Sequence, residues 1–503
     1  MKLLGKVFLL LFLTSILTHS QNYYLDSENG SDLNSGTTPN SPWKTISKIN
    51  KSTFQPGDKI LFKSGLEWRG ELRISSRGTA EAPITISSYG SGEKPIIKGS
   101  EIAKYWRKHS NIVWQSKFEE KPACIWLVDE DKTIHWGLEK ETIDDLENNY
   151  DFVWQDSILY LYLGANPSST FPQIECSVRD YGIINNLDYQ DIDYITIDNI
   201  EIMFTRDANF RAVDVKGWTI INCYSHHSGV TDETNGQGIQ YEGEDGLFTN
   251  NVIYENGQHG FFLSSFGTGL VKNNIIEKNK IYNNYHTGID LMNDGGDELS
   301  HTKTIIRQNL VYETPNFKGI EVGIQTLGYG NGLVTNVKIH HNIVAYVNGA
   351  GISAVSNSDS IFIHNNTVYE TESSCINLDN HKLYAEAYNN IGVNNNYYAA
   401  FFAHDTINKK IDYNIWNTKS DTDTKLTFII DEYYSNHKSY SETVKFDVNG
   451  SDKEVTLTFE NSLPVGINET SISKDAGKIF DYEYDFYGNK IDGKLDIGAI
   501  EVK

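Results

Sequence analysis

Cysteine, proline and basic residues are scarce in this chain of 503 residues, which has 4 Cys, 10 Pro and 43 Lys and Arg against 67 Asp and Glu. Four cysteines are too few for a disulfide framework, and no Cys-x-x-Cys pair suggests a zinc or redox site. The formal net charge of −24 argues against nucleic acid as a partner, because that partner needs a basic face. Apolar residues at helical three- and four-residue spacing are also missing, which argues against an α-helical repeat.

Long apolar runs are missing too, apart from one at the N-terminus, where residues 7–17 follow Lys2 and Lys6. This run is too short to cross a bilayer and is typical of a secretory signal. Residues 1–20 are therefore predicted to be a signal peptide. No cysteine follows the run, so a lipoprotein anchor is not indicated. We expect a secreted or periplasmic protein without a membrane span.

What the chain does contain is a recurring phrase, Asn-x-(Ile/Val)-Tyr, which starts at Asn251, Asn279 and Asn309. Looser copies continue the series at steps of 23 to 33 residues: Asn199, Asn222, Asn342, Asn366 and Asn390. A period in this range marks units that bury a core only by stacking on their neighbours. The units hold short β-branched runs broken by Asn and Gly, which predicts a β-solenoid. The repeated Asn should lie at one turn of every coil, in a left-handed backbone, and bond to a neighbouring coil.

A second element, Gly-(Ile/Phe)-x, recurs in the same frame between Gly238 and Gly351. Alternation along a strand points its apolar residue inward and its third residue outward. Because stacked coils lie about 4.8 Å apart, the outward residues should form a ladder: Asp214, Gln240, Phe262, Asp290, Glu321, Ser353 and Asn377. A second ladder should run three positions earlier: Arg211, Gln237, His259, Thr287, Lys318, Ala350 and Ser374. Titratable groups gather in the middle coils, where a purely structural ladder would be Asn, Ser and Thr.

The repeat also divides the chain. Residues 21–104 are predicted to be an N-terminal cap with the first coils, and 105–180 a small β-rich insertion that breaks the repeat. Coils that carry the active face should occupy 181–416, and C-terminal coils with a closing segment should occupy 417–503. Two cysteines, Cys124 and Cys176, fall in the insertion, either as a disulfide or as separate thiols.

Several phrases together carry a family resemblance. They are the opening Tyr23-Tyr24-Leu25-Asp26, the phrase Pro42-Trp43-Lys44-Thr45-Ile46, the turn Pro56-Gly57-Asp58, the coils, and the ending Asp496-Ile497-Gly498-Ala499. The mature chain resembles secreted bacterial right-handed parallel β-helix proteins of the pectate-lyase-like superfamily, in the style of polysaccharide-utilisation proteins of the Bacteroidota. The resemblance implies an all-β, right-handed parallel β-helix with a carbohydrate groove along one outer sheet. That superfamily includes lyases, glycoside hydrolases and epimerases, so the fold does not name the reaction.

The favoured reaction is β-elimination at a uronate of an acidic polysaccharide such as ulvan, alginate or pectin. The enzyme would be a lyase, or a dehydratase at a terminal uronate. His259, His286 and Lys318 are predicted to transfer protons or bind the uronate carboxylate, because elimination needs a base and a neutralised carboxylate. Asp290 and Glu321 would orient these groups. Substrate contacts are expected from further residues of the same coils: Arg211, Gln240, Tyr241, Glu242 and Asn377.

Two alternatives stay open. Asp290 and Glu321, on adjacent coils, would be the acid and base of a glycoside hydrolase, because neighbouring carboxylates push one pKa upward. A non-catalytic glycan-binding solenoid is the other alternative, and a monomer is expected in either case.

A calcium site is also predicted. Asp290, Asp294 and Asp297 belong to a strand and a Gly-rich loop whose oxygen ligands suit Ca²⁺. The alternative is a surface turn made acidic by ordinary composition.

Overall fold

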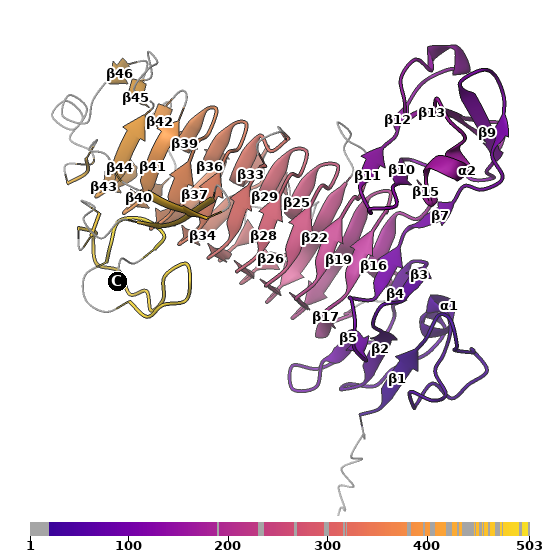
Figure 1. Ribbon diagram of the computed structural model, residues 1–503. Helices are drawn as coiled ribbons and strands as arrows, with labels where there is room; N and C mark the ends of the chain where they lie inside the picture. Colours follow the sequence, from indigo (N-terminus) through magenta and orange to yellow (C-terminus); the bar gives the residue numbers. More distant parts are fainter. Residues whose placement is uncertain are drawn as a thin grey trace, which may run out of the picture.

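The chain winds into a solenoid. The computed structural model describes residues 20–188, 191–229, 236–265, 269–295, 301–314, 317, 319–379, 384–395, 398–402 and 408–418, with shorter stretches between 425 and 500. Each complete coil has three short strands, which stack on those of the next coil in three parallel rows (Figure 1). The predicted all-β parallel β-helix, with its N-terminal cap and β-rich insertion, is confirmed. The predicted signal peptide lies outside the described residues, apart from Ser20.

The first row carries the face on which the candidate site lies. Its strands are β4 (Leu72–Ile74), β16 (Tyr181–Asn185), β19 (Ala208–Lys216), β22 (Gln237–Glu244), β25 (His259–Ser265), β29 (Thr287–Asp294), β33 (Val322–Tyr329), β36 (Ala350–Ser356), β39 (Ser374–Asp379), β42 (Tyr398–Phe402) and β45 (Lys425–Ile429). Successive members of the row pair in parallel.

The second row begins in the N-terminal cap. Its strands are β1 (Asn22–Leu25), β2 (Lys59–Lys63), β5 (Ile84–Tyr89), β17 (Ile195–Asp198), β20 (Thr219–Ile221), β23 (Leu247–Thr249), β27 (Ile275–Glu277), β31 (Ile305–Arg307), β34 (Val334–His340), β37 (Ser358–His364), β40 (Ala385–Tyr388) and β43 (Lys409–Asp412). Two short strands, β26 (Val271–Lys272) and β30 (His301–Thr302), join the first and second rows.

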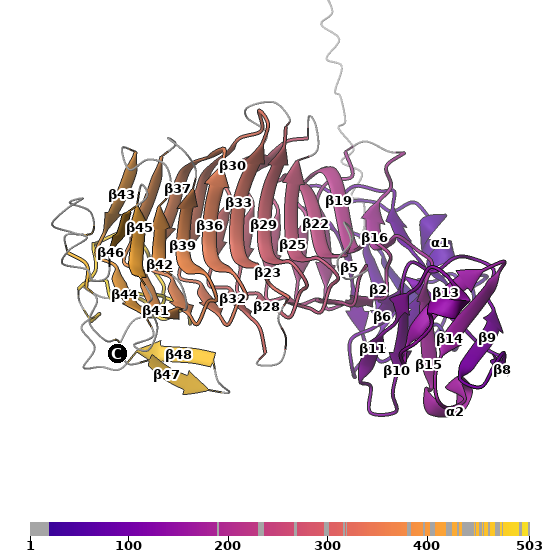
Figure 2. The same cartoon turned by 90° about the horizontal axis from the view of Figure 1, so that it is seen from above.

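The third row closes each coil. Its strands are β3 (Glu67–Arg69), β6 (Ile96–Lys98), β18 (Glu201–Met203), β21 (Tyr224–His226), β24 (Val252–Tyr254), β28 (Lys280–Tyr282), β32 (Leu310–Tyr312), β35 (Ile343–Ala345), β38 (Thr367–Tyr369), β41 (Ile391–Asn395) and β44 (Ile415–Thr418). The C-terminal part adds β46 (Glu432–Tyr434), β47 (Leu457–Glu460) and β48 (Leu463–Ile467), and Figure 2 shows the last two beside the coils.

The interior of the solenoid is one continuous apolar core. Five predicted inward residues of the Gly-(Ile/Phe)-x element are buried in one register: Ile239, Phe261, Ile289, Ile352 and Ile376. In the coil between Ile289 and Ile352 the register places Ile324 in the position predicted for Ile320. At the N-terminal end the short helix α1 (Ile46–Asn50) covers the stack, and its first turn is capped by the Thr45 side chain, which accepts the Lys48 N–H. The cap removes an exposed sheet edge.

Buried asparagines fix the spacing between coils. Seven of them form a ladder along one turn: Asn251, Asn279, Asn309, Asn342, Asn366, Asn390 and Asn414. In each described rung an amide oxygen accepts the backbone N–H of the Asn in the preceding coil, as in the 2.9 Å bond from Asn251 to Asn279. Each Nδ2 also donates to a backbone carbonyl. The prediction of a bonded Asn at every turn is therefore confirmed for these coils.

The predicted left-handed backbone belongs instead to the residue before each ladder Asn. Asn250, Lys278 and Gln308 each have a φ of 56°, which lies in that region. In the earlier copies the phrase is displaced by one position, so Asn222 takes the left-handed place and Cys223 the ladder place. The tyrosine of the phrase stacks on the outside of the third row, where Tyr254 and Tyr282 lie 4.9 Å apart with parallel rings.

The insertion interrupts the early coils and projects from the side of the solenoid (Figures 1 and 2). One of its sheets contains β7 (Ser100–Ile102), β10 (Ile125–Val128), β11 (Ile134–Trp136) and β15 (Gln173–Ser177). The other contains β8 (Arg107–Lys108), β9 (Val113–Lys117), β12 (Leu138–Glu139), β13 (Asp151–Gln155) and β14 (Ile158–Tyr162). Short helical segments η1 (Ile143–Asp145) and α2 (Pro167–Thr170) complete it.

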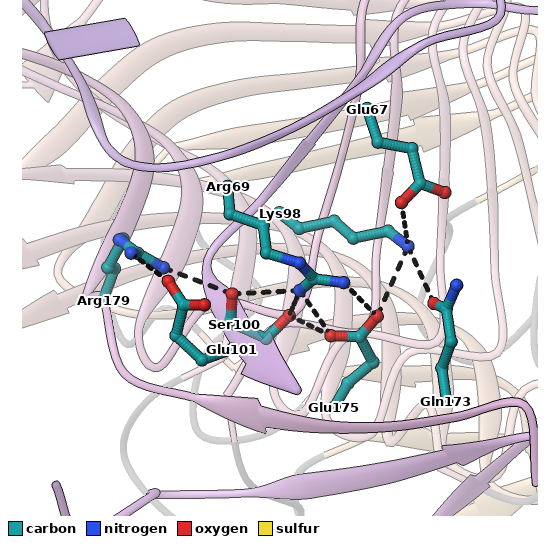
Figure 3. Close-up of polar contacts among 8 residues, drawn as sticks. All are labelled: Glu67, Arg69, Lys98, Ser100, Glu101, Gln173, Glu175 and Arg179. Atoms are coloured by element: carbon teal, nitrogen blue, oxygen red, sulfur yellow. Dashed lines mark hydrogen bonds and ion pairs between the residues drawn. The ribbon is translucent and has the colours of Figure 1, made fainter. Parts of the chain in front are cut away.

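A buried ion cluster anchors the insertion to the first coils (Figure 3). The fully buried Glu175 of β15 accepts two hydrogen bonds from Arg69, at 2.6 and 2.8 Å, and lies 3.3 Å from the Lys98 ammonium. Burial alone would raise the pKa of Glu175, but the Arg69 hydrogen bonds and the Lys98 charge hold it below its ordinary value. Ser100 donates a further bond of 2.8 Å.

The described cysteines are all free and buried, so Cys124 and Cys176 do not form a disulfide. Burial raises the pKa of both thiols well above the ordinary value. None of the helices in the described part of the chain is long and apolar enough to span a membrane.

The Asn ladder generates a stability prediction. Replacing Asn279 with Ala should lower the free energy of unfolding by about 2–4 kcal/mol, because it leaves the Asn251 N–H and the Phe248 carbonyl buried without partners. Urea unfolding followed by circular dichroism measures the loss. The control is Asn22→Ala at the exposed start of β1. Equal midpoints for the two variants would contradict a stabilising role for the ladder.

Candidate functional site

The outward ladder of the first row is the starting point of the site. The paired strands place these residues in one line: Arg211, Gln240, Phe262, Asp290, Gln325, Ser353 and Asn377. Five members were predicted to be there, but Arg211 takes the place expected for Asp214, and Gln325 that expected for Glu321. The register of β19 already pairs Arg211 with Gln240, so Asp214 lies three residues further along the strand, at a β-bulge, with a φ of 52°.

Glu321 leaves the ladder because its coil has a longer turn. Residues 283–286 separate β28 from β29, whereas residues 313–321 separate β32 from β33. The extra residues shift the register, and Glu321 ends the turn instead of entering the strand. Its backbone N–H donates to the His286 carbonyl at 2.7 Å, which holds it beside the preceding coil.

His259 and Asp290 form the buried half of the site. His259 Nδ1 lies 3.6 Å from Asp290 Oδ2, and the two side chains come from adjacent strands. The His259 ring stacks on Phe262 at 4.6 Å with an interplanar angle of 11°. His259 is 5% exposed and Asp290 3% exposed.

His286 and Glu321 form the exposed half. Their side chains lie 3.4 Å apart, and the Glu321 side chain is 64% exposed. The His286 ring meets His259 edge to face, with centroids 5.2 Å apart. His286 Nδ1 is also 2.8 Å from Thr287 Oγ1. The predicted residues His259, His286, Asp290 and Glu321 therefore come together as one cluster, which we call the His–Asp–Glu cluster.

A second Asn ladder positions the turns that carry this cluster. The Asn284 amide oxygen accepts the backbone N–H of Asn256 at 3.1 Å, so the turns before β25 and β29 keep the same shape. His259 and His286 follow these asparagines by three and two residues. In the next coil the buried Glu313 carboxylate accepts the backbone N–H groups of Gly319 and Ile320 and closes the turn that presents Glu321.

Burial sets the protonation of the inner pair. It raises the pKa of Asp290 to about 7 and lowers the pKa of His259 to about 3, with a smaller contribution to His259 from His286. Asp290 Oδ1 and His259 Nδ1 are buried without a hydrogen-bond partner among the described residues. A neutral, protonated carboxyl with an unused oxygen is the chemical form that donates a proton.

The predicted substrate-binding residues lie at different depths. Arg211 is half-buried, donates to Gln240 at 2.6 Å and lies over the Tyr181 ring. Glu242 is buried, with its carboxylate against Gly269. Asn377 is half-exposed, three coils beyond Asp290.

The assignment of Tyr241 to substrate binding is wrong. Its neighbour Gln240 faces outward, so alternation along β22 turns Tyr241 into the core, where it is 0% exposed. Its hydroxyl donates to the Glu244 carbonyl at 3.0 Å. Lys318, the third predicted proton-transfer residue, lies outside the described residues.

The predicted calcium site receives no support from the two ligands that can be placed. Asp290 and Asp294 are four residues apart on β29, about 13 Å along the strand, which is too far for both to bind one ion directly. Asp297 lies outside the described residues. Among the described residues no group of three or more His, Cys, Asp or Glu side chains could hold a metal ion. Calcium stays a prediction.

Sequence reasoning missed the contribution of the insertion. Trp136 of β11 lies 5.6 Å from the Tyr285 ring, and Tyr285 directly precedes His286. The Trp-rich composition of the insertion was the available signal, but it gave no hint of which coil the insertion would contact.

Comparisons with known proteins bear on the fold. A family described as "Right handed beta helix region" matches residues 174–322, which include the whole His–Asp–Glu cluster. The complex of XylC with xylose has a TM-score of 0.55 at 13% identity and covers 96% of this chain and 98% of that one. Pectate lyase Pel9A has a TM-score of 0.51 at 16% identity, with coverage of 96% and 97%. The protein is a right-handed β-helix.

A sequence relative has a more specific name. Lacto-N-biosidase of Bifidobacterium longum subsp. longum is 42% identical over 96 residues, which are 17% of this chain and 6% of that protein. This chain therefore spans only a small part of that relative. The proteins that the chain is similar to thus include one named a lacto-N-biosidase and one named a pectate lyase.

The raised pKa of Asp290 generates a second stability prediction. The unfolded side chain loses its proton near pH 4, whereas the folded one keeps it to about pH 7. The wild-type protein therefore loses stability as pH rises from about 4 to about 7, while Asp290→Asn does not. Thermal unfolding across this range should show the variant gaining up to about 4 kcal/mol on wild type above pH 7. A difference that is constant with pH would contradict the buried, protonated carboxyl.

Proposed function

We propose that this protein is an exported glycoside hydrolase whose proton donor is Asp290. The observation that carries the proposal is the buried Asp290 carboxyl, which stays protonated to about pH 7 beside a face lined by polar side chains. The named similarity to a lacto-N-biosidase supports hydrolysis over elimination. The apolar run over residues 7–17 supports export.

The two carboxyls have complementary roles in the proposed reaction. Asp290 donates its proton to the glycosidic oxygen as the bond between that oxygen and the anomeric carbon breaks. Glu321 removes a proton from the water that attacks the anomeric carbon. One water is consumed in each turnover, and the proton gained by Glu321 equals the one lost by Asp290.

The histidines connect these carboxyls. His286 lies 3.4 Å from Glu321, and its ring contacts His259, which lies 3.6 Å from Asp290. These separations are longer than hydrogen bonds, so after each turnover Glu321 would release its proton to solvent and Asp290 would take one up from solvent.

β-Elimination is the second candidate. The observation that favours it is Arg211, a half-buried cation on the same face, which would attract a uronate carboxylate although it already lies 3.7 Å from Asp207. Against it, burial lowers the pKa of His259 to about 3, which makes this imidazole a weak base.

Product analysis distinguishes the candidates. Incubation with neutral polysaccharides and with ulvan, alginate, pectin and glycosaminoglycans should release reducing ends without the absorbance of an unsaturated uronate. Asp290→Asn and Glu321→Gln should each lower kcat at least about 100-fold, because each removes a group that transfers a proton. Tyr105→Ala, at an exposed residue of the insertion, is the control and should keep full activity.

Other outcomes of this assay are informative. Unsaturated-uronate absorbance would contradict hydrolysis and establish elimination, and glycan binding without products would establish a binding protein. A chelator should leave the rate of hydrolysis unchanged. Loss of hydrolysis in the presence of the chelator would support Ca²⁺ at Asp294 and Asp297.

The pH profile tests the role of Asp290. The proton donor must be protonated, so kcat/KM should fall as pH rises through about 7, the pKa to which burial raises Asp290. Initial rates from about pH 4 to about pH 9 on the substrate found above give the profile. A kcat/KM that keeps rising above pH 7 would show that a base, and not an acid, limits the reaction.

A further inference from the structure

Three aromatic side chains from separate segments meet beside the His–Asp–Glu cluster. Trp136 comes from the insertion, Tyr285 from the turn before β29 and Phe317 from the turn before β33. The Trp136 and Tyr285 rings lie 5.6 Å apart, and the Tyr285 and Phe317 rings 4.8 Å apart. All three are half-exposed. Tyr285 adjoins His286 in sequence, and the turn with Phe317 ends at Glu321.

The strand register holds Trp136 in a fixed position. Trp136 pairs with Trp126 across β10 and β11, and Trp126 pairs with Glu175, the centre of the buried ion cluster of Figure 3. Trp126 packs on Phe204 of the coils at 4.7 Å, and the Trp136 ring stacks on His227 at 5.7 Å. Trp136 is therefore a rigid side chain, anchored on both sides.

The indole N–H of Trp136 is unused. Seven of the nine tryptophans donate this group to a protein acceptor: Trp43, Trp68, Trp106, Trp114, Trp154, Trp218 and Trp416. The eighth, Trp126, is fully buried with an unpaired N–H. Trp136 alone is half-exposed with no hydrogen-bond partner among the described residues. Its donor is thus available to a ligand.

We propose that Trp136, Tyr285 and Phe317 form a sugar-binding subsite next to the His–Asp–Glu cluster. A pyranose ring presents apolar C–H groups to the aromatic surface, and one of its hydroxyls accepts the Trp136 N–H. This subsite gives the insertion a function, because it supplies one wall of the site. Its place on the substrate rests on the proposed hydrolase function.

The charges around the subsite indicate which sugar it takes. Two acidic side chains lie near it: Glu321 lies beside His286, and Glu255 lies 3.0 Å from His227, on which Trp136 stacks. A uronate carboxylate would be repelled here. The subsite therefore takes a neutral pyranose, which agrees with the net charge of −24.

Affinity electrophoresis tests the subsite separately from catalysis. Full-length Asp290→Asn protein, which should not degrade the ligand, is run in native gels that contain soluble arabinoxylan, galactan, laminarin, pectin or alginate. At least one neutral polysaccharide should retard it more than pectin and alginate do. Adding Trp136→Ala should raise the apparent Kd for that polysaccharide about tenfold. Adding Trp136→Phe, which keeps most of the packing but has no N–H, should raise it severalfold.

Tyr105→Ala in the same background is the matched control, because Tyr105 is an insertion aromatic with 86% exposure. The proposal is overturned if both Trp136 variants migrate like this control, if no neutral polysaccharide retards the protein, or if pectin or alginate retards it more. Retardation of the Asp290→Asn protein that depends on Trp136, together with a wild-type protein that releases no reducing ends, would support the subsite and refute the hydrolase. If the wild-type protein releases reducing ends but the Trp136 variants are retarded as strongly as the Tyr105→Ala control, the hydrolase is supported and the subsite is refuted.

Discussion

Stacking of coils at a fixed spacing is the constraint on which the rest of the structure depends. A coil of three short strands has no core of its own, so it folds only against its neighbours. The buried Asn ladder fixes that spacing, because each amide satisfies the backbone of the preceding coil. The same spacing brings His259 of one coil within 3.6 Å of Asp290 of the next, although 31 residues separate them in sequence.

The site shows how function opposes stability in this fold. Its outer face would be most stable with Asn, Ser and Thr, yet it buries an acid and an imidazole that have unpaired polar atoms. Burial raises the pKa of Asp290 to about 7, and in the proposed hydrolysis this costly burial would make the carboxyl a proton donor. The surrounding coils supply the rigidity that holds such a group in place.

Sequence periodicity predicted the solenoid, its inward row and the meeting of His259, His286 and Asp290, because these features depend on one repeating spacing. It failed where the repeat is locally broken. Asp214 lies three residues after the ladder position of its coil, and the long turn before β33 leaves Glu321 four residues before the position that Gln325 takes. The sequence also did not predict how the insertion is anchored to the coils, because Glu175 and Arg69 are 106 residues apart and belong to no repeat.

The central claim is that burial holds a protonated Asp290 carboxyl at the surface where the substrate binds. Carbon-13 NMR of protein labelled at the Asp carboxyls, with the Asp290 signal identified by its loss in Asp290→Asn, measures this directly. The account predicts that the Asp290 signal titrates near pH 7. Titration near the ordinary value of about 4 would contradict it.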